Sequence, residues 1–254
     1  MNVASDFTTM EIVQDIKANK NSTLRNDFLS SYLISSRLSP YLSGYYINRK
    51  VVPNKITLYM IISGVIGGIL FAMPNIFFKI LGALVIHLWF VLDCSDGEVA
   101  RYTKTFSKFG KEMDYIAHLI DHPFFGLALF LSLNQLGRYN PYYLAVTIIL
   151  SNFLDYLYRN VISLYDVIDL KEAENKTQSN TIIDEKWNLK SIVGFVVSIF
   201  IIYPNLILFG VLIYFIDLWA GSSLLYSFII ISNGLTLIYL LKMLKDLTIK
   251  FYKS

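Results

Sequence analysis

Six stretches of mostly apolar residues recur along the chain, separated by shorter polar segments. They cover approximately residues 56–73, 76–93, 116–135, 141–162, 191–216 and 222–241. Each is close to the roughly 20 residues that an α-helix needs to cross the hydrocarbon core of a bilayer. The fifth stretch is the longest and contains Pro204, which predicts a kink or a tilt there. The pattern predicts an all-α integral membrane protein with six transmembrane helices.

The composition agrees with this interpretation. Hydrophobic residues make up 55% of the chain and charged residues only 16%, and there are 18 Phe and 18 Tyr, aromatic residues that favour membrane interfaces. A net charge of +3 is too small to suggest a nucleic-acid partner. The single cysteine, Cys94, excludes an intramolecular disulfide and is expected to be a small packing residue.

The distribution of Lys and Arg predicts the orientation of the spans. Of the 22 basic residues, all but Lys79 and Arg138 lie before the first span, between the second and third, around the loop after the fourth, or after the sixth. Such an excess marks the cytoplasmic side. We therefore expect both termini and the loop between the second and third spans to face the cytoplasm.

The chain divides into three parts on this basis. Residues 1–50 form an arm that mixes apolar, aromatic and basic residues; we expect a helix lying along the headgroups, with a loosely ordered tail as the alternative. Residues 51–246 form the six-helix membrane domain, and residues 247–254 a cytoplasmic tail. Gly64 and Gly68 make a small-residue pattern in the first span that favours packing within the subunit over a dimer contact.

Most of the candidate chemistry lies between Leu92 and His122, at the ends of the second and third spans. Two sets of residues fall on one face each of two predicted helices: first Asp93, Asp96, Gly97, Ala100 and Arg101, and then Gly110, Asp114, His118 and Asp121. Residues 104–109 would join the two helices as an antiparallel pair whose faces converge at the cytoplasmic surface. Glu98 and Glu112 fall outside both sets and are expected to face solvent.

Converging carboxylates repel one another and are costly to bury unless a cation neutralises them. Mg²⁺ or Mn²⁺, which prefer oxygen ligands, are the natural partners, and one or two such ions would bind a diphosphate. Gly97, Ala100 and Gly110 would let a ligand approach the backbone, and Arg101 can pair with a carboxylate or a phosphate.

The segment resembles the signature of the CDP-alcohol phosphotransferases, also called CDP-alcohol phosphatidyltransferases, D-x2-D-G-x2-A-R-x8-G-x3-D-x3-D. The matching residues are Asp93, Asp96, Gly97, Ala100, Arg101, Gly110 and Asp114, each at the required spacing. The segment Pro53–Thr57 before the first span is also similar to the family. The resemblance implies transfer of a substituted phosphate from a CDP-alcohol to an acceptor alcohol or lipid, with release of CMP, by a homodimer in the membrane.

The resemblance also implies roles for individual residues. Asp93, Asp96 and Asp114 would bind the metal, with two ions of Mg²⁺ or Mn²⁺ as the expected complement. The fourth family aspartate, which also touches metal and is the proposed base, is replaced by His118. We favour His118 as the general base with Asp121 in support; Asp121 as the base, or an inactive site, stays open.

By the same resemblance, the nucleotide would bind on the motif helix. Its candidate contacts are Asp93, Gly97, Ala100, Arg101 and Gly110, with Asn54 and Thr57 as weaker candidates because Pro53 and Asn54 equally suit a helix start. Arg159 is a candidate for the acceptor, although pairing with Asp155 four residues earlier is the favoured interpretation.

Two alternatives remain for the function. A phosphatidyltransferase that uses CDP-diacylglycerol and a polyol or polyol phosphate would have the same site and differ only in its donor. An ion-coupled membrane transporter belongs to another class; the clustering of the acids at one face argues against it, because an ion path needs polar groups along the membrane.

Overall fold

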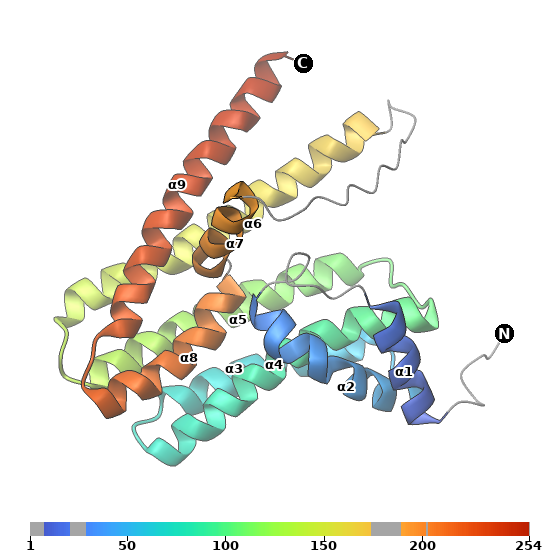
Figure 1. The fold of residues 1–254 in the computed structure, drawn as a ribbon, viewed down its shortest axis with the longest axis horizontal. Coiled ribbons are helices and arrows are strands. Elements are labelled where there is room, and N and C mark those ends of the chain that lie inside the picture. Colours follow the sequence, from blue (N-terminus) through green and yellow to red (C-terminus); the bar gives the residue numbers. More distant parts are fainter. Residues whose placement is uncertain (1–7, 21–28, 174–188, 202, 254) are drawn as a thin grey trace.

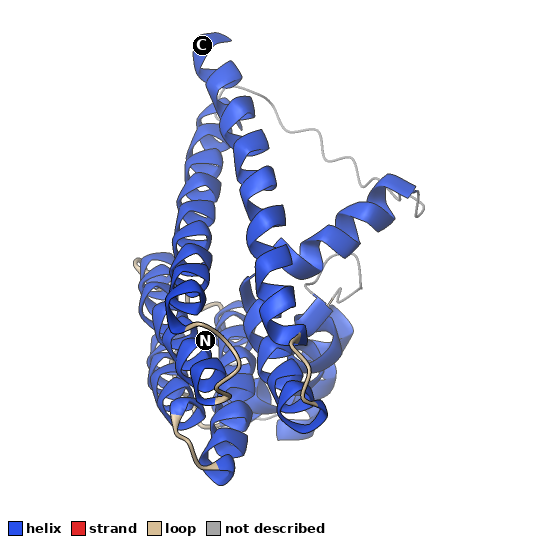
Figure 2. Cartoon of the chain, turned by 90° about the vertical axis from the view of Figure 1, so that its left-hand side faces the viewer, coloured by secondary structure: helices blue, strands red, loops and turns tan. Residues whose placement is uncertain are grey.

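The computed structural model describes residues 8–20, 29–173, 189–201 and 203–253, and in these ranges all regular structure is helical (Figures 1 and 2). The arm contains α1 (Thr9–Asn19), a π-helical turn η2 (Ser31–Ser35) and α2 (Ser36–Asn48). The longer helices are α3 (Pro53–Ala72), α4 (Ile76–Thr103), α5 (Gly110–Gln135), α6 (Pro141–Ala173), α7 (Leu189–Ile201), α8 (Tyr203–Ala220) and α9 (Leu224–Lys253). The predicted all-α class is confirmed.

Among the described residues, five helices are long and apolar enough to cross a membrane: α3, α4, α5, α8 and α9. This confirms an integral membrane protein with several spans. The predicted fourth span, 141–162, lies within α6 but is not among the five. Polar side chains interrupt its apolar run, namely Asn152, Asp155, Arg159 and Asn160. A total of six spans therefore stays a prediction.

The predicted fifth span, 191–216, is divided between α7 and α8. Pro204 is the second residue of α8. Proline lacks the backbone N–H that an interior helical position would donate, and its ring disfavours the helical conformation of the preceding residue. Residue 202, between the two helices, lies outside the described part of the chain, so the expected kink or tilt stays a prediction.

The packing of α3 against α4 and α5 forms the centre of the molecule. A Cβ atom on Gly82 of α4 would lie 2.3 Å from the backbone nitrogen of Phe71, so these two helices touch through their backbones. In the predicted small-residue pattern, Gly64 faces Asp121 and Gly68 faces Phe124 of α5. Both glycines therefore pack within the chain, as the sequence suggested.

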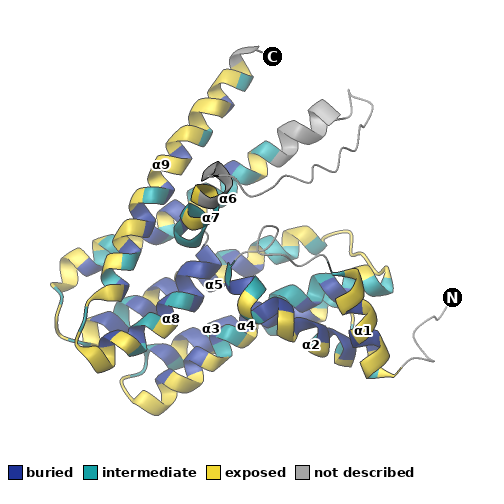
Figure 3. Cartoon of the chain, in the orientation of Figure 1, coloured by how far each residue is buried: buried dark blue, intermediate teal, exposed yellow. Residues whose placement is uncertain are grey.

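The helices α6 and α9 pack against each other and extend away from this centre (Figure 1). Their contact is a separate apolar cluster made of Leu154, Val161, Leu240 and Leu247. The outer part of α9 is largely exposed, whereas α3, α4 and α5 bury one another (Figure 3). The acidic motif lies on two of the central helices, α4 and α5, and not on this pair.

The arm is helical where it is described, and it packs on the chain. Helix α1 packs against α2, and α2 packs against α4. Both lie at the end of the bundle where α4 leads into α5 (Figure 1). Residues 21–28 lie outside the described part of the arm. The arm therefore borders the segment that carries the acidic motif.

Candidate active site

The length of α4 carries the motif beyond the apolar part of the helix. Its 28 residues span about 42 Å at 1.5 Å per residue, more than the roughly 30 Å of a hydrocarbon core. The helix ends at Thr103 because Lys104 adopts a left-handed conformation with φ of 53°. Gly110 then begins α5. The short link predicted at residues 104–109 is present, and it brings the two polar faces together.

Three predicted site residues meet between α4 and α5. The Nε2 atom of His118 lies 3.4 Å from Oδ1 of Asp93 and 3.5 Å from Oδ1 of Asp114. His118 is buried, Asp93 is partly buried and Asp114 is the most open of the three. Among the described residues, His118 is the only ion-pair partner of either carboxylate. The predicted convergence of the two helix faces is confirmed for these residues.

This donor set suits a divalent cation. One ligand atom from each of the three residues lies within 4.8 Å of the others. Opposite ligands of a bound Mg²⁺ are about 4.2 Å apart, so small side-chain movements would close the three around one ion. Two carboxylate oxygens favour Mg²⁺ or Mn²⁺, and an imidazole nitrogen is less suited to Mg²⁺. The residues fit a metal, and the partial exposure of Asp114 leaves a side open for a ligand.

Asp96 is outside this three-residue group. Its Oδ2 accepts a hydrogen bond of 2.6 Å from the hydroxyl of Thr57 on α3. Asp93 and Asp114 are still close enough for their charges to act on it. Thr57, predicted as a weak nucleotide contact, thus holds a predicted metal ligand in the described structure.

The remaining motif positions line the surface of α4 and the helix starts near it. The Arg101 guanidinium lies over Gly97, where a Cβ atom would be 3.0 Å from Nη1. Ala100 and Gly110 are half-buried. On α3, Pro53 occupies the first turn, as the helix-start interpretation predicted, and the Asn54 amide donates to the Ser107 hydroxyl at 3.0 Å.

Asp121 is also outside the three-residue group. It is fully buried against Gly64, and its Oδ2 accepts a hydrogen bond of 2.7 Å from the Trp89 indole. Neither its Oδ1 nor Nδ1 of His118 has a hydrogen-bond partner among the described residues. A direct hydrogen bond by which Asp121 would orient His118 is therefore not formed here.

Arg159 belongs to a network that the sequence revealed only in part. Its Nε lies 3.5 Å from Oδ1 of Asp155, so the predicted pairing is present. His122 was not recognised: its Nδ1 lies 2.7 Å from Oδ2 of Asp155, and its Nε2 lies 3.2 Å from Nη2 of Arg159. Because Arg can only donate, His122 Nε2 accepts and Nδ1–H donates. Tyr203 stacks on the His122 ring at 4.0 Å and donates to the His122 carbonyl.

This network adjoins the acidic centre, since the His118 and His122 rings are 5.1 Å apart. The signal in the sequence was the four-residue spacing from Asp114 through His118 to His122. The contact of Tyr203 with His122 depends on the tertiary fold, and no local sequence pattern predicts it.

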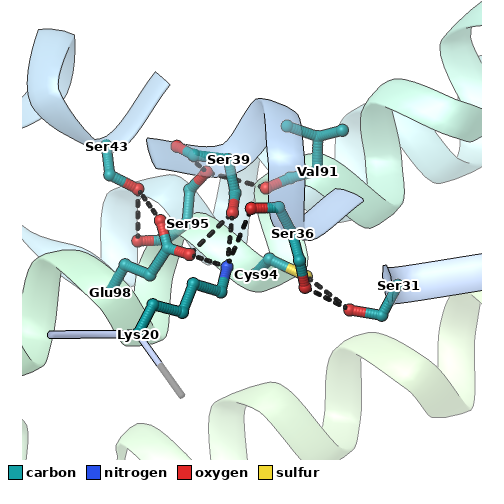
Figure 4. Close-up of polar contacts among 9 residues, drawn as sticks. All are labelled: Lys20, Ser31, Ser36, Ser39, Ser43, Val91, Cys94, Ser95 and Glu98. Carbon is teal, nitrogen blue, oxygen red and sulfur yellow. Dashed lines mark hydrogen bonds and ion pairs between the residues drawn. The ribbon is translucent and has the colours of Figure 1, made fainter. Parts of the chain in front are cut away.

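The expected exposure of Glu98 is wrong. Glu98 is buried at the contact between α4 and the arm, where it pairs with Lys20 (Figure 4). A helical wheel shows that Glu98 faces away from the metal ligands but not that another helix covers that side. Glu112 is exposed, as expected.

Comparison with known proteins agrees with this geometry. The family model described as CDP-alcohol phosphatidyltransferase matches residues 50–237, most of the chain. The match begins after α2 and includes the acidic motif and the whole α6 network. A search among curated proteins finds no match.

Proposed function

Because the chain belongs to the CDP-alcohol phosphatidyltransferase family, a family of transferases, we propose that it transfers a substituted phosphate from a CDP-alcohol to an acceptor alcohol. The acceptor hydroxyl would attack the phosphorus that carries the alcohol of the donor. A phosphodiester forms, the bond to CMP breaks, and CMP leaves. The observation that carries the proposal is the cluster of Asp93, Asp114 and His118 at the end of the motif helix.

We assign Asp93, Asp96 and Asp114 to the metal ions, with two ions of Mg²⁺ or Mn²⁺ as the expected complement. When bound, such ions neutralise the diphosphate and the negative charge that develops on it. The partial exposure of Asp114 and the position of Asp96 beside Thr57 support a site that opens toward α3 and solvent.

We assign the general base to His118. Its Nε2 faces Asp93 and Asp114, and two carboxylates within 3.5 Å would stabilise a proton taken from the acceptor hydroxyl. Asp121 is assigned a supporting role, as a buried carboxyl on the same face of α5 as His118. Its complete burial against Gly64 disfavours direct contact with an acceptor.

We place the cytidine nucleotide on the motif helix. Gly97 and Ala100 on α4 and Gly110 at the start of α5 carry little or no side chain, and Arg101 supplies a cation for a phosphate. Asn54 and Thr57 border the same region from α3, although their hydrogen bonds to Ser107 and Asp96 are already made.

We assign Arg159 to the acceptor. Its side chain is 22% exposed, while its Nε is buried in the pairing with Asp155. His122 and Asp155 would hold it beside the acidic centre. This arrangement suits an acceptor that carries an anionic group.

The membrane arrangement follows from the same reasoning. We propose six crossings, with α6 as the fourth and α7 with α8 together as the fifth, and a cytoplasmic location for both termini and the site. The arm would comprise residues 1–50, the membrane domain 51–246 and the tail 247–254, and the family resemblance favours a homodimer. The excess of Lys and Arg at one end of the spans supports this orientation.

The donor can be identified by direct assay. The purified protein is incubated with Mn²⁺ or Mg²⁺, an acceptor mixture, and one donor at a time from CDP-diacylglycerol, CDP-glycerol, CDP-ribitol, CDP-inositol, CDP-choline and CDP-ethanolamine. We expect CMP release from one donor class, lost on chelation and in Asp114→Asn. Release from CDP-diacylglycerol alone would select the phosphatidyltransferase alternative. If no donor gives CMP release that depends on the cation, the proposal is contradicted and the transporter alternative is favoured.

A further inference from the structure

Both oxygens of the buried Glu98 carboxylate are bonded by the arm. Glu98 is 5% exposed, its Oε1 accepts from the Ser39 hydroxyl at 2.6 Å, and its Oε2 accepts from the Ser43 hydroxyl at 2.7 Å (Figure 4). The Lys20 ammonium completes the set by pairing with Oε1. This carboxylate therefore has a complete set of donors and no part in the acidic centre.

Lys20 joins three elements at one point. It follows α1 directly and also donates to the Ser39 hydroxyl at 3.1 Å and to the Ser36 carbonyl at 3.3 Å, both on α2 (Figure 4). Through Glu98 the same ammonium reaches α4. A single side chain thus ties the end of α1 to α2 and to the motif helix.

Short polar side chains surround Glu98 where α2 packs against α4. Ser95 of α4 donates to the Ser39 carbonyl at 3.4 Å and to its own helix at Val91, 2.7 Å away. Ser35, Ser39 and Ser43 recur every four residues and form one buried face of the arm. Short side chains allow the two helices to approach closely, so Glu98 is held from more than one direction.

This contact lies on the same turns of α4 as the predicted metal ligands. Glu98 follows Asp93 by five residues and Asp96 by two, about 140° and 200° further round an ideal helix. The arm therefore packs against the face of α4 that is opposite the metal ligands, over the same two helical turns. An apolar contact could hold the helices together, whereas a hydrogen-bonded buried ion pair also fixes their register.

We propose that Glu98 and Lys20 are positioning residues for the reaction. By fixing the rotation of α4 against the arm, they hold Asp93 and Asp96 in the orientation that binds the cation opposite α5. The inference rests on the cation site of the proposed function and adds the arm as part of the catalytic unit. It acts through the metal ligands and involves no contact with substrate.

The test measures cation binding without turnover. Mn²⁺ is titrated into the purified full-length protein, and free Mn²⁺ is followed by electron paramagnetic resonance. In Lys20→Met and Glu98→Gln we expect the dissociation constant for Mn²⁺ to rise roughly fivefold or more, and in Lys20→Arg to stay near the wild-type value. The matched control is Lys17→Met, because Lys17 lies on α1 three residues before Lys20, and among the described residues its ammonium donates within the arm, to the Tyr41 hydroxyl at 2.8 Å.

A second readout separates positioning from loss of folded protein. With the active CDP-alcohol donor, a positioning defect raises the Mn²⁺ concentration needed for half-maximal rate, and excess Mn²⁺ restores the maximal rate. A folding defect lowers the maximal rate and leaves that concentration unchanged. The charge reversal Lys20→Glu with Glu98→Lys should recover part of the lost affinity.

The outcomes are distinct for the two proposals. Wild-type protein that binds no Mn²⁺ would overturn the proposed function, and the positioning role with it. Wild-type protein that binds Mn²⁺, together with a Lys20→Met variant of unchanged affinity, would overturn the positioning role alone. An equal loss of affinity in Lys17→Met would overturn it too, because any weakening of the arm would then suffice. If Glu98→Gln fails to fold, the two Lys20 variants decide.

Discussion

Replacing Gly64 with alanine adds one methyl group at the contact between α3 and the buried carboxyl of Asp121. A Cβ atom there would lie 2.5 Å from Cγ, 2.6 Å from Oδ1 and 2.9 Å from Oδ2 of Asp121. Ordinary contact begins at 3.4 Å, so the carboxyl would have to move by about 0.9 Å. The Trp89 indole, now 2.7 Å from Oδ2, would lose its hydrogen bond or move with it.

The expected cost follows from these contacts. A hydrogen bond to a charged group contributes about 1.5–3 kcal/mol, and overpacking a tight site costs about 1–3 kcal/mol. Alanine recovers about 1 kcal/mol relative to glycine inside a helix. The free energy of unfolding should therefore fall by roughly 2–5 kcal/mol in Gly64→Ala.

The measurement is an SDS titration of the protein in mixed micelles, followed by far-ultraviolet circular dichroism. Gly234→Ala is the matched control, because a Cβ atom at Gly234 would have no neighbour within 4 Å among the described residues, so this substitution should leave stability unchanged or slightly raised. Removing the obstacle should cancel the effect, so Gly64→Ala should cost little in an Asp121→Ala background. A Gly64→Ala protein as stable as Gly234→Ala would refute the described packing of Asp121.

Three further predictions concern the site itself. His118→Ala should lower turnover by about 100-fold or more at saturating cation, since a general base contributes at least that factor; near-normal turnover in the CMP-release assay would exclude the base assignment. Thr57→Val removes the 2.6 Å hydrogen bond to Asp96, so the cation concentration for half-maximal rate should rise about threefold to tenfold, and a Thr57→Ser control should stay close to wild type. Tyr203→Phe removes the donor to the buried His122 carbonyl and should lower the free energy of unfolding by about 1–3 kcal/mol in the SDS titration; an unchanged value would contradict that hydrogen bond.

Helix periodicity was sufficient to predict which side chains of the site come together, whereas their roles came from the family resemblance. Asp93 lies on one helix, Asp114 and His118 on the next, and a short link forces the two helices to run antiparallel. These relations are local, so spacing was sufficient to bring the three side chains together. The class of fold followed in the same way from the length of the apolar segments.

The depth of each residue was not predictable in this way. Periodicity correctly placed Asp121 on the inner face of α5. It gave no indication that Gly64 of α3 packs closely against the Asp121 carboxyl and buries it. The environment of Glu98 likewise depends on the docking of α2, whose residues lie more than fifty positions earlier in the chain. Contacts between distant segments carry no local signal, although the serine spacing of α2 is recognisable once its partner is known.

The number of membrane crossings could be predicted only in part, because recognition of a span depends on its apolar composition. The predicted fifth span contains α7 and α8, with Pro204 near the start of α8. In α6, Asp155 and Arg159 serve a polar network with His122, and the same residues lower the apolar character by which a span is recognised. Polar residues that serve such a network therefore weaken the apolar pattern by which a helix is recognised as a span.

The most direct test of the account is the location of Mn²⁺ in an experimental structure of the protein with a cytidine nucleotide. We predict an anomalous-scattering peak bonded to Asp93 and Asp114, with Asp96 beside it and the nucleotide diphosphate on its open side. A structure in which Mn²⁺ and nucleotide bind elsewhere, or in which these carboxylates separate when both are present, would contradict it.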